Sequence, residues 1–228
     1  MPIVYKSNDV MNREKVLDYI KAKKLENPEY KVIDVGGSAN PWCEGYVDAY
    51  VDFIDSPDKR VIQGDINEAE VWDVLSKEKW DFCICTHTLE DIRDPKYVLN
   101  NIRKIASAGF ISVPNKHTEL SSIESKNYLG FCHHRWIFQI TNLNVLRAIG
   151  KFHIINNLLP FRRSFLSIFD SKNSHGIKWV DKELVGRNYE LAFIWEDTFD
   201  FEFINNDFAG ESCRELSMLF VEDLSEGL

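Results

Sequence analysis

The sequence predicts an α/β fold built on a doubly wound, mostly parallel sheet. Short apolar segments alternate with helical segments along the chain, and several of the apolar segments are almost continuously hydrophobic. Such strands are typical of parallel sheets that helices cover on both faces. With 228 residues, 44% hydrophobic and 28% charged, the chain has globular composition. We therefore expect a single domain over residues 1–228.

The first part of the chain is predicted to form a helix and three strands. Residues 9–25 place apolar side chains such as Val16 and Ile20 on one helical face, and Asn27-Pro28 ends the segment. A glycine pair at Gly36-Gly37 ends the first apolar run. The strands are expected at Lys31–Val35, Val47–Phe53 and Arg60–Gln63.

Two helices and two strands are expected next. Asn67 and Glu70 have the spacing of a capping box, which predicts a helix to about Lys77. Asp94-Pro95 predicts the start of a second helix, ending near Gly109. The inner face of this second helix would hold Val98, Ile102 and Ile105. Strands are expected at Trp80–Thr86 and Phe110–Pro114.

The second half of the chain gives weaker patterns. Residues 116–138 look irregular, and a helix is expected at about Asn142–Ile149, closed by Gly150. Further strands are expected at Phe152–Leu159, Leu191–Glu196 and Phe199–Ile204. The two last strands offer an edge that another copy of the chain can pair with, which leaves a homodimer open.

Function is sought in the residues that follow each strand, because ligands of open α/β sheets bind beyond the carboxyl ends of the strands. Asp34-Val35-Gly36-Gly37-Ser38 ends the first strand, and its glycines let a ligand approach the backbone. The loop lacks the G-x-G-x-x-G spacing of a dinucleotide site, and Asn40-Pro41 interrupts the helix that such a site needs.

Acidic residues and a histidine follow the next three strands. Asp52 can accept both hydroxyls of a ribose, and Asp55 is a second candidate that can equally cap a turn. Asp65 can accept from an exocyclic amine while Ile66 packs on a ring. His87 follows the fourth strand in the stretch Thr86-His87-Thr88-Leu89-Glu90-Asp91-Ile92.

The order of these motifs resembles the class I S-adenosylmethionine-dependent methyltransferase family, especially its small-molecule branch. The most specific stretch is the fourth strand with its His-Thr-Leu-Glu-Asp-Ile-Arg-Asp-Pro end, because the family often reads Leu-Glu-His followed by a hydrophobic residue and Asp-Pro. Residues 31–115 carry the resemblance well, and it extends more faintly to Phe152. It departs from the family at Ser38 and Asn40, where glycines are usual, and at Asp91, where the histidine is usual.

The resemblance implies a seven-stranded sheet with the last strand antiparallel and S-adenosyl-L-methionine as the cofactor. It divides the chain into an N-terminal helical segment (1–30), a cofactor-binding half (31–115) and a substrate-facing, C-terminal half (116–228). Asp34, Gly36, Gly37 and Ser38 would border the methionine part of the cofactor. Asp52 would hold the ribose, Asp65 and Ile66 the adenine, and Thr86 and His87 the inner wall.

The function expected from this resemblance is transfer of a methyl group to a small polar acceptor. An alcohol or amine acceptor needs a base, and histidine titrates in the suitable range. His87 and His134 are the catalytic candidates, while His117 and His133 are less favoured. Neighbours on an extended segment point in opposite directions, so at most one of His133 and His134 is expected to face a given pocket. Two alternatives remain: a degenerate protein that binds the cofactor without catalysis, and a nucleotide-sugar or dinucleotide oxidoreductase.

Charge is distributed unevenly along the chain. The net charge is −9, which disfavours nucleic acid and anionic membranes as partners. Residues 126–187 nevertheless carry a net charge of +7, with ten basic and three acidic residues, whereas residues 188–228 carry −10. The basic segment includes Arg135, Arg162 and Arg163, whose guanidinium groups suit phosphates and carboxylates. An anionic acceptor, such as a phosphorylated or glycosyl compound, is therefore the favoured substrate class.

The five cysteines and the N-terminus predict a cytoplasmic protein. No two cysteines form a CxxC pair, so no structural metal site is expected. The sequence has no secretory signal and no run of the roughly 18 apolar residues that a membrane span requires.

Overall fold

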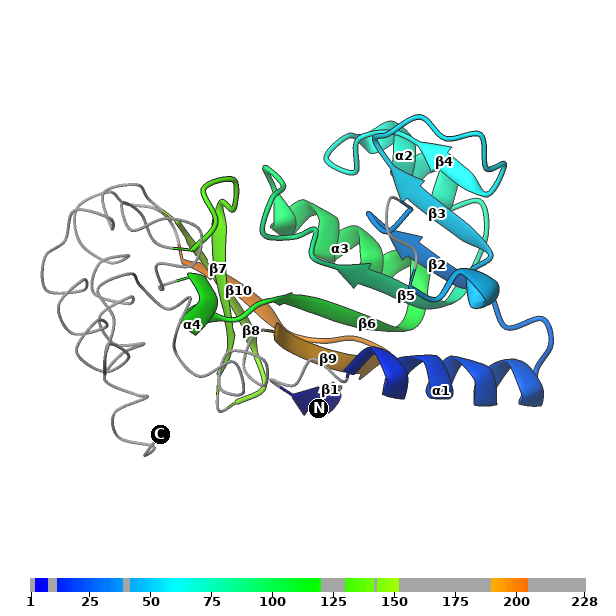
Figure 1. The fold of residues 1–228 in the computed structure, drawn as a ribbon, viewed down its shortest axis with the longest axis horizontal. Helices are drawn as coiled ribbons and strands as arrows, with labels where there is room; N and C mark the ends of the chain where they lie inside the picture. The colour runs from blue at the N-terminus through cyan, green and yellow to red at the C-terminus, as the bar shows by residue number, and fades with distance from the viewer. Residues whose placement is uncertain are drawn as a thin grey trace, which may run out of the picture.

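The computed structural model describes residues 3–7, 12–38, 42–119, 130–141, 143–151 and 190–204. Within these ranges the largest element is a seven-stranded sheet (Figure 1). In spatial order its strands are β1 (Ile3–Ser7), β9 (Glu190–Glu196), β6 (Ala106–Pro114), β5 (Trp80–Thr86), β2 (Val32–Val35), β3 (Ala49–Asp52) and β4 (Val61–Gln63).

The strand directions confirm the expected fold class. Strands β2 to β6 pair in parallel with one another. Strand β9 runs antiparallel to both β6 and β1. The sheet is therefore α/β, mostly parallel and seven-stranded, with its last strand antiparallel. Because β9 is paired on both sides, it offers no free edge, and that part of the expected edge pairing is wrong.

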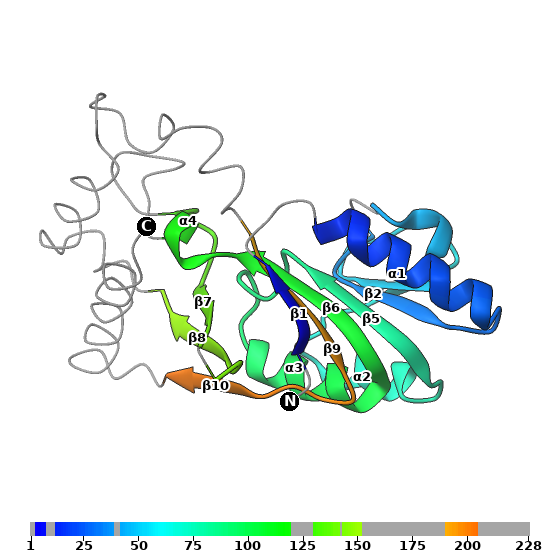
Figure 2. The same cartoon turned by 90° about the horizontal axis from the view of Figure 1, so that it is seen from below.

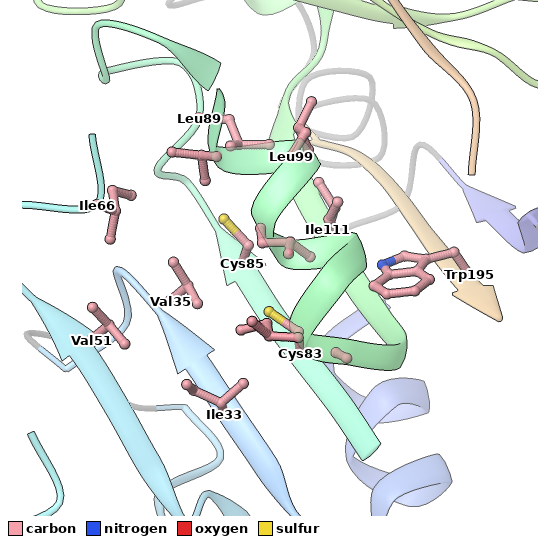
Figure 3. Packing of buried hydrophobic residues seen from close by; sticks show 14 of the residues in the cluster. Ile33, Val35, Val51, Ile66, Cys83, Cys85, Leu89, Leu99, Ile111 and Trp195 are labelled. Atoms are coloured by element: carbon pink, nitrogen blue, oxygen red, sulfur yellow. The ribbon is translucent and has the colours of Figure 1, made fainter. Parts of the chain in front are cut away.

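Helices cover both faces of the sheet, which is the doubly wound arrangement (Figure 1). Alternate residues of a strand point to opposite faces. Ile33 and Cys83 therefore pack with the helices α2 (Ala69–Leu75) and α3 (Pro95–Ile105), as Figure 3 shows for the sheet and α3. Val32 and Phe82 pack with the helix α1 (Asn12–Glu26) and with Tyr46 of the short helix η1 (Glu44–Tyr46) on the other face.

Helix α3 begins as its sequence predicts. The Asp94 carboxylate accepts a hydrogen bond from the Tyr97 backbone N–H at 2.9 Å, and Pro95 is the first helical residue. The helix ends at Ile105 rather than near Gly109, because Gly109 lies inside β6. A side chain at Gly109 would meet the backbone of Cys83 and the indole of Trp195, so this glycine is required by close packing between strands.

The predicted capping box at Asn67 is wrong. Helix α2 is capped by Glu68, without a side-chain hydrogen bond. The Asn67 side chain instead donates to Asp65 and accepts from the Asp94 backbone N–H, so it joins the loops after β4 and β5. Asn67 therefore makes tertiary contacts rather than the helix cap that the local spacing predicted.

A second sheet lies beside the main one and consists of β10 (Phe201–Ile204), β8 (Leu146–Gly150) and β7 (Trp136–Ile140) (Figure 2). The helix expected at Asn142–Ile149 is wrong, because Leu146–Gly150 pairs with both β7 and β10. The turn between β7 and β8 holds Asn144 at a φ of 59°. A short apolar run has no periodicity that separates a strand from a buried helix, so only its partners decide. Within the segment 116–138 that was expected to be irregular, a short helix, α4 (Lys116–Glu119), and the start of β7 form instead. Residues 130–135 are irregular as expected, and residues 120–129 lie outside the described residues.

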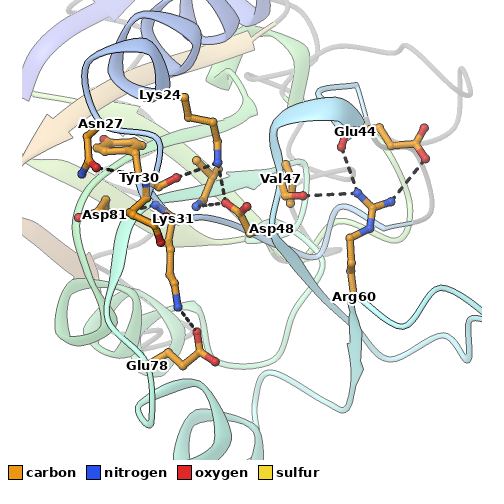
Figure 4. Close-up of polar contacts among 12 residues, drawn as sticks. Lys24, Asn27, Tyr30, Lys31, Glu44, Val47, Asp48, Arg60, Glu78 and Asp81 are labelled. Atoms are coloured by element: carbon orange, nitrogen blue, oxygen red, sulfur yellow. Dashed lines mark hydrogen bonds and ion pairs between the residues drawn. The ribbon is translucent and has the colours of Figure 1, made fainter.

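Ion pairs fix the amino ends of the strands, at the edge opposite the ends where function is expected (Figure 4). Asp48 accepts from Lys24 Nζ at 2.8 Å and from the Val32 backbone N–H at 2.7 Å. Arg60 donates to the backbone oxygens of Glu44 and Val47. These contacts hold the starts of β2, β3 and β4 in register.

Some expectations fall outside the described residues. The strand at Phe152–Leu159 and the arginines Arg162 and Arg163 belong to this group. Among the described residues, no helix is both long enough and apolar enough to cross a membrane.

Candidate functional site

A cavity of about 560 Å³ opens at the carboxyl ends of β2, β3, β4 and β5. This volume is in the range of small-molecule sites. Its lining includes five of the residues predicted from the sequence: Gly36, Asp52, Asp65, Ile66 and His87. Asp34, Gly37, Ser38 and Thr86 lie in the same loops or strands but are not part of the lining.

The turn after β2 needs both of its glycines. Gly36 has a φ of 86°, and its N–H donates to the Val51 carbonyl at 2.7 Å. A Cβ at Gly36 would overlap the Thr88 side chain, and one at Gly37 would overlap the Asp34 carboxylate. The backbone is thus packed tightly against β5 and against the buried acid, which leaves the cavity side open.

Asp34 is a fully buried carboxyl beneath this turn. Both of its carboxylate oxygens lack a hydrogen-bond partner among the described residues. Burial raises the pKa of Asp34 to about 7, Arg13 opposes the shift, and Asp52 adds to it. A buried, unpaired acceptor of this kind is costly, so it marks a place that a cationic donor would satisfy.

Asp52 ends β3 and joins two loops of the cavity. Its Oδ2 accepts from Ser38 Oγ at 2.7 Å, and its Oδ1 accepts from the Ile54 backbone N–H at 3.0 Å. Each carboxylate oxygen has a further lone pair, so the group can still accept from a ligand hydroxyl. Asp55, the second candidate after this strand, is exposed and does not line the cavity.

The loop after β4 supplies an acid and an apolar wall. Asp65 Oδ1 accepts from both the backbone N–H and the side-chain amide of Asn67, each at 2.8 Å. These hydrogen bonds lower the pKa of Asp65 and keep it ionised. Ile66 is buried, while Phe53 is 75% exposed at the rim, which is unusual for a large aromatic side chain.

His87 lies between two glutamates. Its Nε2 is 2.6 Å from Glu190 Oε1, and its Nδ1 is 3.3 Å from Glu90 Oε1, a distance that makes an ion pair without good hydrogen-bond geometry. Burial disfavours the charged ring, but the contacts to Glu190 and Glu90 outweigh it and raise the pKa of His87 to about 9. His87 is therefore an imidazolium at neutral pH. Its backbone is in the left-handed region, with a φ of 48°, a strain typical of functional positions.

Glu190 was not singled out from the sequence. It begins β9, far from His87 along the chain, and also pairs with Arg13 of α1 at 3.3 Å. A signal did exist, because the amino end of an antiparallel strand lies at the same edge as the carboxyl ends of its parallel neighbours. Once the last strand is taken as antiparallel, its first residue belongs to the ligand edge.

His134 lies behind the cavity rather than in its wall. Its Nδ1 is 2.6 Å from Oε1 of Glu119, a fully buried carboxylate whose other oxygen accepts from Lys151 Nζ at 2.5 Å. Its Nε2 is 3.7 Å from Oδ1 of Asp91, which does line the cavity. Glu119 is the last residue of α4, and Lys151 directly follows β8. Neither residue was a candidate from the sequence.

The expectation that His133 and His134 point in opposite directions is wrong. Residues 132–133 form a turn, and the His134 N–H donates to the Phe131 carbonyl. The two imidazole rings are perpendicular with centroids 4.5 Å apart, and both Nε2 atoms face Asp91. The rule for extended segments does not apply on a turn.

The charges in the cavity wall fall into two groups. Asp52 and Asp65 lie on the β3 and β4 side, whereas His87, Arg93 and Arg135 lie on the side of the loop after β5, together with Asp91. The Arg135 backbone N–H donates to the Glu90 carbonyl at 2.6 Å, which fixes this part of the wall. One side suits hydroxyl donors and the other suits anions.

Comparisons with known proteins give only remote likenesses. No protein-family model and no curated protein matches the chain. Among solved structures, the chain is similar to the methyltransferase domain of bacterial CtHen1-C, with 10% identity, a TM-score of 0.43 and coverage of 82% of this chain and 99% of that one. It is also similar to a putative methyltransferase in complex with the Haloferax volcanii Trm112 methyltransferase activator, with 13% identity, a TM-score of 0.41 and coverage of 84% and 95%. The N-terminal domain of EvdMO1 with SAH bound matches at 9% identity and a TM-score of 0.36, with coverage of 79% and 80%.

Proposed function

We propose that this protein is an S-adenosylmethionine-dependent methyltransferase that acts on a small polar, anionic acceptor. The observation that carries the proposal is the cavity at the carboxyl ends of four adjacent parallel strands, with one predicted cofactor contact after each of them. When bound, this cofactor supplies a methyl group on a positively charged sulfur.

The residues present fit the parts of such a cofactor. Asp52 would accept from the ribose hydroxyls, with Ser38 holding one of its oxygens in place. Asp65 and Ile66 would contact the adenine. Gly36, Gly37 and Ser38 would border the methionine part, where the unpaired oxygens of Asp34 favour a nearby ammonium group. Thr86 and His87 would form the inner wall.

Methyl transfer by direct displacement depends mainly on alignment of the acceptor. Positioning alone can lower such a barrier by about 7–11 kcal/mol. Two arginines line the cavity wall. Arg93 is also paired with Glu68 at 3.0 Å, so Arg135 gives the main support for an acceptor with a phosphate or carboxylate.

The two candidate catalytic histidines have different relations to the cavity. His87 lines it, but a pKa of about 9 leaves only a small neutral fraction at pH 7, and both of its ring nitrogens face glutamates. The neutral fraction that can act as a base would increase as the pH rises towards 9. His134 would act only through Asp91, which separates it from the cavity.

Calorimetric titration tests the cofactor proposal. S-adenosylmethionine and its homocysteine product should bind with one site per chain, and nicotinamide dinucleotides should give no heat. Asp52→Ala should weaken binding at least 10-fold, because it removes the acceptor of two hydroxyl hydrogen bonds worth about 1.4 kcal/mol or more together.

The matched control is Asp55→Ala, which removes an exposed carboxylate three residues away that does not line the cavity. It should leave the affinity unchanged. No heat with either sulfur compound would sink the proposal, and heat without methyl transfer to any phosphorylated or carboxylated acceptor would favour the degenerate, cofactor-binding alternative.

A further inference from the structure

Asp91, His133 and His134 come together at the edge of the cavity. The nearest ring nitrogens of the two histidines and one Asp91 oxygen all lie within 4.8 Å of one another. Asp91 Oδ1 is 3.7 Å from His134 Nε2 and 4.0 Å from His133 Nε2. Neither contact is a hydrogen bond, because both exceed the accepted donor–acceptor range.

The contact to Glu119 determines which ring nitrogen of a neutral His134 carries the proton. Glu119 is a buried carboxylate that also accepts from Lys151, so it needs a donor from the imidazole. A neutral His134 therefore carries its proton on Nδ1, and the Nε2 lone pair faces Asp91. Asp91 Oδ1 is itself buried and without a hydrogen-bond partner among the described residues. Two lone pairs that face each other across this gap call for a cation between them.

We propose that Asp91, His133 and His134 bind a divalent transition-metal ion. Two imidazole nitrogens and one carboxylate oxygen form the ligand set of many catalytic sites for such ions, which keep at least one position open. Metal bonds of about 2.0–2.2 Å would place these ligands slightly closer together than they are. His133 can make that adjustment, because its side chain is 57% exposed.

The surroundings of His134 match those of a metal-bound histidine. Such histidines usually give their second ring N–H to a carboxylate, which orients the ring and makes it a better ligand. The 2.6 Å contact to Glu119 is of this kind, and Lys151 keeps Glu119 in place. The cluster thus has both its ligands and an outer partner without any metal-binding cysteine pair.

The ion would lie beside the acceptor side of the cavity, since Asp91 lines it together with His87 and Arg135. An open position there would bind an oxygen of the acceptor and lower the pKa of a hydroxyl, a task that protonated His87 performs poorly at neutral pH. This role rests on the proposed methyltransferase function, whereas the metal site itself does not.

The test is titration of chelator-treated, desalted protein with Co²⁺, without cofactor or acceptor. We expect one Co²⁺ per chain with visible d–d absorption, displacement by Zn²⁺, and no competition from Mg²⁺, which prefers all-oxygen sites. Because binding is read without S-adenosylmethionine, failure of this site and failure of the methyltransferase proposal are distinguished.

Three variants locate the ion. His133→Ala changes an exposed residue and should abolish the saturable absorption without affecting folding, as should the isosteric Asp91→Asn. Glu119→Gln should weaken Co²⁺ by roughly 10–100-fold, the usual cost of losing an outer partner. Cys132→Ser, a change at the exposed neighbour of His133, is the control and should bind as the unaltered protein does. No saturable binding, or binding that survives both His133→Ala and Asp91→Asn, overturns the proposal.

Discussion

His87 and His134 each contact a buried glutamate at the same distance, but the charged groups around the two contacts differ. His87 Nε2 and His134 Nδ1 are each 2.6 Å from a glutamate oxygen. His87 has a second carboxylate, Glu90, on its other nitrogen, and this excess of negative charge raises its pKa to about 9. The glutamate of His134 is already paired with Lys151. The two histidines therefore share a 2.6 Å contact with a buried glutamate and differ in the charges around that contact.

The largest expected effect is on stability, at the cluster of His134. Glu119→Ala removes the only carboxylate that contacts both Lys151 and His134 among the described residues, and the Lys151 side chain is 10% exposed. Leaving a buried charge without its partner costs about 3–5 kcal/mol. Urea denaturation should show that loss in the free energy of unfolding.

Glu190→Ala is the matched change at the other histidine. It should cost less, because His87 keeps Glu90 as an ion-pair partner. If the two alanine variants lose equal stability, the two clusters are not different in the way described.

The next effect comes from Asp34, a buried acid without a hydrogen-bond partner among the described residues. The pKa of Asp34 is raised by burial to about 7, above its value of about 4 in an unfolded chain. A raised folded-state pKa contributes stability below the unfolded pKa, and this contribution is lost as the pH rises through 7. Asp34→Asn should therefore become more stable relative to the unaltered protein between pH 4 and pH 8, by on the order of 4 kcal/mol.

Denaturation curves at several pH values measure this difference. Asp55→Asn, at an exposed position, should show no such trend. A flat difference for Asp34→Asn would mean that folding does not raise the pKa of the Asp34 carboxyl.

The charge of His87 can be measured directly. Glu190→Gln removes one of the two negative charges beside the ring, so the pKa of His87, read by NMR titration of the ring protons, should fall from about 9 by about one unit or more. The stability contributed by this histidine is present below about pH 6.5 and lost as the pH rises through 9. That loss should shift to lower pH in the variant.

Glu196→Gln is the control, because Glu196 lies at the opposite end of β9 and accepts from Tyr19. It should leave the titration of His87 in place. An unchanged titration in Glu190→Gln would show that Glu90 alone holds the proton.

The smallest effect concerns the cofactor side of the cavity. Ser38→Ala removes the 2.7 Å hydrogen bond to Asp52 and should weaken S-adenosylmethionine by about 0.5–1.5 kcal/mol, a 2- to 13-fold change in affinity. Calorimetry measures it. Ser38→Thr, which keeps the hydroxyl, should bind more tightly than Ser38→Ala.

Sequence reasoning worked where structure is determined locally. Trp80–Thr86 is a mostly apolar run and forms β5 with those bounds, and Asp94-Pro95 starts α3 with a hydrogen bond from the Tyr97 backbone to the Asp94 side chain. It failed where distant partners decide. Leu146–Gly150 is a strand because β7 and β10 lie beside it. The Asn67 side chain accepts from the Asp94 backbone N–H instead of capping α2.

The candidate site follows the same division. Its residues after β2 to β5 could be predicted, because each position is defined by the end of its own strand. Glu119 and Lys151 could not, since they reach His134 through a turn that extended geometry does not describe. Glu190 was missed, although the expected antiparallel last strand places its first residue at the ligand edge.

The pairing of β1 with β9 has a consequence for how the protein is made. Ser7 of β1 pairs with Ala192 of β9. At about 20 residues per second, a ribosome adds β9 on the order of ten seconds after β1, so β1 stays unpaired for that time. Strands β2 to β5 need no such delay, because each pairs only with strands made shortly before or after it. The cofactor side can therefore assemble during synthesis, whereas His87 receives Glu190 only when β9 arrives. The charge on this histidine is settled among the last events of folding.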